Sequence, residues 1–178
     1  MREFGKVLAR FWTGQTGKEI RRSGTTCQIV ALYLVTNPNA NAIGLYYLPL
    51  ATAAHELGIP VDEIRKELLR LRELRFAAFD EISETAFVFN MAKFQIGPSL
   101  RREDKNVPWI RREVAKMQYS PFYEEFVAMH RTDYHLADLV LTDQSPAPLS
   151  ERPRDMTAAQ AQAEITERQK MAKANDKR

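Results

Sequence analysis

The sequence predicts a mainly α-helical protein that carries a small β-hairpin. Apolar residues recur at helical spacing over residues 61–74, and residues 75–90 alternate and are rich in aromatic side chains. Of the 178 residues, 44% are hydrophobic and 28% are charged, which is ordinary for a globular protein with one core and some appendages. Cys27 is the single cysteine, so no intramolecular disulfide is possible. No signal peptide or membrane span is visible, and we expect a cytoplasmic protein.

The first helices are predicted from their start and stop signals. Residues 16–19 (TGKE) have the spacing of a capping box and predict a short helix that ends before Gly24. The run IVALYLV then predicts a buried helix that must end near Pro38. Cys27 stands near its start and is expected to be a small buried thiol, because no histidine or cation is evident beside it.

A strand and two closely connected helices follow. Residues 43–48 predict a short strand, and Pro49 suits the first turn of a helix over residues 50–57. Gly58 provides the backbone freedom that ends this helix, and a longer helix begins near Pro60. Its apolar residues share one helical stripe. They are Val61, Ile64, Leu68, Leu71 and Leu74, with Leu69 beside them.

The remaining chain divides into a hairpin, further helices and a tail. Residues 75–90 predict a β-hairpin whose polar turn is residues 80–84. Helices are expected from Pro108 to about Met117 and again after Pro121. From residue 143 the chain is rich in proline and poor in apolar residues. We therefore expect a domain over 1–98, a basic helical extension over 99–142 that packs on it, and a flexible linker with an exposed tail helix over 143–178.

This order of elements is that of a winged helix-turn-helix domain followed by extra C-terminal helices. Ala54 is small where two helices cross, Gly58 makes the turn four residues later, Ile59 points inward, and Ile64 packs the second helix on the first. In helix-turn-helix proteins the second helix enters the major groove of DNA. The sequence therefore predicts duplex DNA binding through the helix at about residues 60–74.

Candidate DNA contacts are basic residues that read bases or neutralise phosphates, with two polar residues on the preceding helix. On the predicted recognition helix they are Arg65, Lys66, Arg70 and Arg72, preceded by Thr52 and His55. Further phosphate contacts are expected from Arg101, Arg102, Lys105, Arg111 and Arg112. Residues 1–22 hold six basic and two acidic residues, and residues 101–116 hold six basic and three acidic ones.

Acidic residues keep a second function open. Asp62 and Glu63 begin the predicted recognition helix, and the wing tip DEISE at 80–84 is acidic where a wing that follows DNA is normally basic. Such a fold also serves protein recognition. The alternative function is therefore an interaction or inhibitor module that binds a host or phage protein rather than DNA.

The chain resembles the N-terminal winged-helix domains of phage replication-initiation proteins of the replisome-organiser type. The resemblance rests on the segments LYLVTNPNANAIGLYYLPL, AAHELG, FVFNMAKFQ and VPWIRREVAKM, and it covers about residues 1–130. It implies origin DNA binding in the cytoplasm of a host cell, and a possible partner such as a helicase or its loader. Only about 35 residues follow the start of the linker, so we expect no full second domain.

The sequence gives no sign of an enzyme, a metal site or a cofactor. It contains no phosphate-binding loop and no nucleophile elbow. His130, Asp133 and His135 lie close in sequence, but without a partner motif elsewhere they are expected to form a surface cluster. Four aromatic residues are expected in the core rather than as a base-stacking platform: Trp12, Tyr46, Tyr47 and Phe87.

Overall fold

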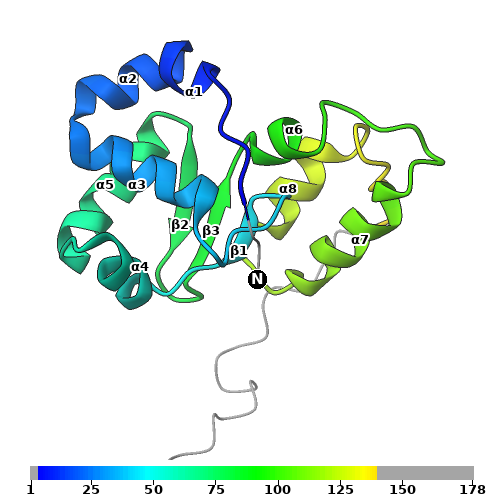
Figure 1. Ribbon diagram of the computed structural model, residues 1–178. Coiled ribbons are helices and arrows are strands. Elements are labelled where there is room, and N and C mark those ends of the chain that lie inside the picture. Colours follow the sequence, from blue (N-terminus) through cyan, green and yellow to red (C-terminus); the bar gives the residue numbers. More distant parts are fainter. Residues whose placement is uncertain (1–3, 140–178) are drawn as a thin grey trace, which may run out of the picture. The chain divides into compact units, whose positions relative to one another are not determined.

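The computed structural model describes residues 4–139, which all belong to one compact unit, Met1–Leu141 (Figure 1). This part of the chain is mainly helical and contains a small three-stranded antiparallel sheet. The linker and tail expected over 143–178 lie outside the described residues.

The helices and strands follow one another closely along the chain. The helices are α1 (Arg10–Thr13), α2 (Gln15–Ser23), α3 (Thr25–Thr36), α4 (Leu50–Leu57), α5 (Val61–Glu73), α6 (Met91–Gln95), α7 (Asn106–Lys116) and α8 (Tyr123–His130). The strands are β1 (Leu45–Tyr47), β2 (Ala77–Asp80) and β3 (Thr85–Val88). Helices α1 and α6 were not predicted, because four or five residues are too few to show a helical period.

The start of α2 corrects the predicted capping box. The helix begins at Gln15 after the N-cap residue Gly14, and no side chain caps it. Glu19 instead accepts a hydrogen bond of 2.8 Å from the Gln15 amide one turn before it. The expected helix is present, but a pairing within the helix replaces the capping interaction.

The sheet has the strand order β1-β3-β2, so β1 adds a third strand to the predicted hairpin. Phe87 of β3 lies opposite Leu45 on one side and opposite Ala78 on the other. Figure 1 shows the sheet between α2–α5 and α6–α8. Because successive side chains of a strand point to opposite faces, each strand contributes to two separate cores.

The first core joins α2, α3, α4 and α5 to one face of the sheet. Ala86 and Val88 of β3 pack there with residues such as Ile64 and Leu71 of α5. Cys27 is also fully buried in this core, as expected, and burial is the main reason that the pKa of its thiol rises to about 11. Nearby Glu67 raises that pKa further.

The second core joins the other face of the sheet to α6, α7, α8 and the segment after α8. Phe87 of β3 stands in it, 5.8 Å from Phe126 of α8 between ring centroids. Ile110 and Val114 supply the buried face of α7. The helices of the expected extension over 99–142 are thus held to the sheet by a hydrophobic core of their own.

The structure corrects the expected burial of three side chains, one histidine and two aromatic residues. His130 was expected on the surface, but it is fully buried between the rings of Phe126 and Tyr134. Trp12 and Tyr47 were expected in the core, but both are exposed. Single-residue burial depends on contacts between distant segments, which local periodicity does not report.

The buried His130 predicts a loss of stability in mild acid. Neither of its ring nitrogens has a hydrogen-bond partner among the described residues, and burial, helped by Lys93, lowers its pKa from 6.5 to about 4. Between these values the unfolded chain binds a proton that the folded chain does not, so the free energy of unfolding falls as the pH drops below 6.5.

We expect His130→Phe to remove a pH-dependent loss on the order of 2 kcal/mol. Thermal unfolding followed at several pH values between neutrality and mild acid measures this loss. Parallel pH profiles of the variant and the original chain would show that His130 is not the group responsible.

Candidate functional site

The turn between α4 and α5 is set by one glycine in a left-handed backbone conformation. Gly58 has φ 65° and ψ 27°, and the amide of Ile59 donates to the carbonyl of Ala54 at 3.3 Å. A side chain at residue 58 would meet no neighbouring atom within 4 Å, so the backbone angles rather than space favour glycine. Pro60 then precedes α5 as its N-cap residue.

Helix α5 buries one side and presents the opposite side to solvent. Ile64, Leu68 and Leu71 are buried, as the apolar stripe predicts. The outward side carries Asp62, Lys66, Leu69 and Glu73, all of which are exposed. Leu69, expected beside the buried stripe, has 62% of its surface exposed. No described element covers this side, so it is available to a partner.

Two of the four arginine and lysine residues expected to contact DNA are engaged within the protein. Arg65 pairs with Asp62 at 2.5 Å and with Glu81 of the wing tip at 2.7 Å. Arg70 donates to the carbonyl of Ser23 at the end of α2 at 3.1 Å, and it lies 3.4 Å from Glu67. Arg65 therefore joins α5 to the wing, and Arg70 joins α5 to α2.

The other predicted residues of this region are accessible. Lys66 and Arg72 are exposed, and their side chains make no hydrogen bond or ion pair with the described residues. On α4, His55 is exposed and Thr52 is half-buried. Lys66 and Arg72 are thus the cations of α5 that can reach a phosphate without giving up an internal contact.

The α2–α3 junction borders α5 on the side of Arg70. In addition to the contact between Arg70 and Ser23, the Thr26 hydroxyl donates to Glu63 at 3.2 Å. Arg21 and Arg22 are exposed in the last turn of α2. The basic charge of residues 1–22 is visible in the sequence, but its place at this edge of α5 is visible only in the structure.

The later basic residues lie on the other side of the sheet, where α7 packs against the second core (Figure 1). Arg111 makes a bidentate pair with Asp138 and donates to the carbonyl of His135 at 2.8 Å. Its hydrogen bonds lower the pKa of Asp138 to about 2. Arg111 therefore holds the chain after α8 to α7. The remaining members of the predicted group are exposed: Arg101, Arg102, Lys105 and Arg112.

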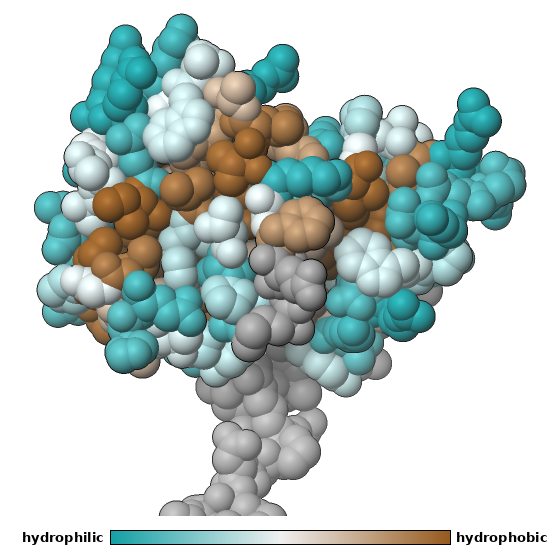
Figure 2. Space-filling view, viewed as in Figure 1, coloured by the Kyte–Doolittle hydropathy of each residue, from teal (hydrophilic) through white to brown (hydrophobic). Residues whose placement is uncertain are grey.

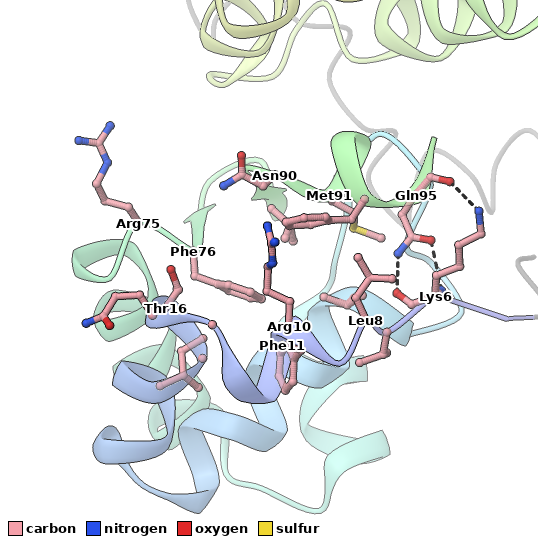
Figure 3. A pocket seen from close by; sticks show the side chains of 18 residues that line it. Lys6, Leu8, Arg10, Phe11, Thr16, Arg75, Phe76, Asn90, Met91 and Gln95 are labelled. Atoms are coloured by element: carbon pink, nitrogen blue, oxygen red, sulfur yellow. Dashed lines mark hydrogen bonds between the residues drawn. The ribbon is translucent and has the colours of Figure 1, made fainter. Parts of the chain in front are cut away.

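A groove that the sequence analysis did not predict lies between the N-terminal segment and the β3–α6 region (Figure 3). Its volume is about 180 Å³, and Phe11, Phe76 and Met91 contribute to its apolar lining. Figure 2 shows hydrophobic side chains gathered in the middle of the same face. Lys6 and Gln95, far apart in sequence, are tied together at one end of the groove by hydrogen bonds in both directions.

Residues 4–139 contain no group of three or more histidine, cysteine, aspartate or glutamate side chains that could hold a metal ion. None of the helices in that range is long and apolar enough to span a membrane.

No family model, no curated protein and no solved structure matches this chain.

Proposed function

We propose that the chain is a winged-helix protein of the phage replication-initiation type that binds duplex DNA through α5. The observation that carries the proposal is the outward side of α5, which follows a tight glycine turn, lies next to a two-stranded wing, and is not covered by any described element. A helix placed in this way fits the major groove. The strand order β1-β3-β2, with β1 before the two helices, supports the same fold.

The distribution of basic residues around α5 indicates where the phosphates of a bound duplex would lie. Residues 60–84 hold seven acidic and five basic residues, so α5 and the wing alone would not attract a polyanion. Residues 4–24 hold five basic residues and one acidic one, and their last turn borders α5. In this proposal Lys66 and Arg72 contact one strand of the duplex, while Arg21 and Arg22 contact phosphates from the α2 edge.

We expect Lys66→Ala and Arg72→Ala each to weaken duplex binding several-fold without changing the melting temperature. Because each removes one phosphate contact, each should reduce the slope of log affinity against log salt by about 0.9. Fluorescence anisotropy of labelled duplexes across a salt series measures both effects. Arg131→Ala, an exposed arginine beyond α8, is the matched control. The absence of binding to any duplex at low salt would refute the proposed function.

A second candidate function is recognition of a protein partner by the same surface. Three large apolar side chains are exposed around α5 and the wing: Ile82 at 79%, Leu69 at 62% and Tyr47 at 56%. Glu81 and Glu84 lie among them. Exposed apolar residues with acidic neighbours suit a basic protein surface better than a phosphate backbone.

The double change Glu81→Lys and Glu84→Lys separates the two functions. If the surface binds duplex DNA, the change should tighten that binding, because it removes two anions, adds two cations and releases Arg65 from Glu81. If the surface binds a basic protein, a complex that co-purifies at moderate salt should be lost. The double change Glu124→Lys and Glu125→Lys, at two exposed residues of α8, is the control for the same change in net charge. Weaker DNA binding by the double variant would contradict the duplex interface.

A further inference from the structure

The groove between the N-terminal segment and the β3–α6 region has the chemistry of a ligand site. Its wall of α1 and α2 is fixed by close packing, because a Cβ atom at Gly17 would lie 1.9 Å from the carbonyl oxygen of Phe11. On the opposite wall, Phe76 lies 6.3 Å from Phe11 between ring centroids. The pair of hydrogen bonds between Lys6 and the Gln95 side chain closes one end. Contacts within the protein therefore fix the walls of the groove before any ligand arrives.

The charged residues of the groove are all cations. Lys6, Arg10 and Arg75 line it, and its lining includes no aspartate or glutamate. Figure 3 shows Arg75 at one end, Lys6 at the other and Arg10 between them. Arg10 and Arg75 make no side-chain hydrogen bond or ion pair with the described residues. A ligand that carries negative charge at more than one point along the groove would match this arrangement.

The size of the groove limits what can enter it. A volume of about 180 Å³ lies below the roughly 300 Å³ at which pockets begin to hold drug-sized ligands. It admits one ring system rather than a whole helix face or a long acyl chain. Phe94 also lines the groove, and 45% of its surface is exposed, which leaves the ring accessible for stacking. Asn90 and Thr16 supply polar groups at the edges.

We propose that this groove binds an unpaired nucleotide of a single-stranded nucleic acid, at a site separate from the α5 surface. A base enters the apolar centre and stacks on an aromatic ring, and the phosphates on either side of it meet the cations along the groove. Aromatic side chains combined with a positively charged track are the usual means of holding single strands. The proposal does not depend on duplex binding by α5.

The backbone at Arg75 makes glycine a suitable test residue. Arg75 follows the end of α5 with φ 52°, a left-handed conformation in which glycine or asparagine is the more favourable residue. The conformation belongs to the helix end, where the amide of Phe76 donates to the carbonyl of Leu71 at 2.9 Å. The side chain of Arg75 borders the groove. Arg75→Gly therefore removes the cation while relaxing the turn.

The test uses the full chain and fluorescein-labelled oligothymidine of about ten nucleotides, a length within the range that single-strand binding folds cover. Anisotropy should show binding that weakens several-fold in Arg75→Gly and about tenfold in Phe94→Ala, whereas Arg131→Ala binds as the original chain does. The melting temperature of Arg75→Gly should be unchanged or higher, which separates a lost contact from lost folding. Binding of an oligouridine of the same length is measured in parallel. Tighter binding of one of the two oligonucleotides shows whether the groove prefers RNA or DNA.

A blunt-ended duplex with no unpaired nucleotide, measured with the same variants, keeps this site distinct from the duplex interface. We expect Phe94→Ala to leave binding of this duplex unchanged and Lys66→Ala to leave oligothymidine binding nearly unchanged. The absence of oligothymidine binding at low salt, or equal binding by Phe94→Ala, Arg75→Gly and Arg131→Ala, would overturn the proposal even if the blunt-ended duplex still bound.

Discussion

The structure depends on a central strand that is buried on both faces. All four residues of β3 are buried, and β3 pairs with β1 on one edge and β2 on the other. Ala86 and Val88 belong to the first core, and Phe87 belongs to the second. With its backbone hydrogen bonds paired on both edges, β3 can be dry on both sides without leaving unsatisfied polar groups. The two groups of helices are therefore built on one short strand.

This arrangement determines which surface of α5 can act. The first core takes up Ile64, Leu68 and Leu71, so the opposite side of the helix must face solvent. The wing is fixed relative to α5 by the pair of Arg65 with Glu81, and the α2 edge is fixed by Arg70. Each of these contacts uses an arginine that could otherwise bind a phosphate. Because Arg65 and Arg70 are engaged in these contacts, they are not free to bind phosphate. The positive charge that remains available is on Lys66, Arg72 and the end of α2.

Local signals in the sequence were sufficient for α3, α4, α5 and the hairpin. The turn at Gly58 and the bounds of α4 follow from a glycine and a proline whose effects act over a few residues. The partners of the predicted site residues could not be found in this way. Arg70 meets Ser23, and Arg111 meets Asp138, over long stretches of chain. Phe126 and Tyr134 stand four residues before and after His130, and the three rings are buried together because Phe126 and Tyr134 pack in the second core.

The groove was missed for a related reason. One wall comes from residues before α3, and the other comes from residues after α5, so that Lys6 and Gln95 are 89 residues apart when they meet. The segment 11–17 (FWTGQTG) contributes Phe11, Gly14, Gln15, Thr16 and Gly17 to the lining of the groove. Gly17 permits the close approach of α1 to α2, but its meaning is visible only when the backbone of Phe11 lies against it.

The central claim is that the outward side of α5 is the surface that contacts duplex DNA. Titration of the isotope-labelled chain with a short closed hairpin duplex, followed through backbone amide chemical shifts, tests it most directly. We expect the largest changes at Asp62, Lys66, Leu69 and Glu73, with smaller ones at the end of α2 and little change in α7 and α8. Large changes confined to α7 and α8, or no change at low salt, would contradict the claim.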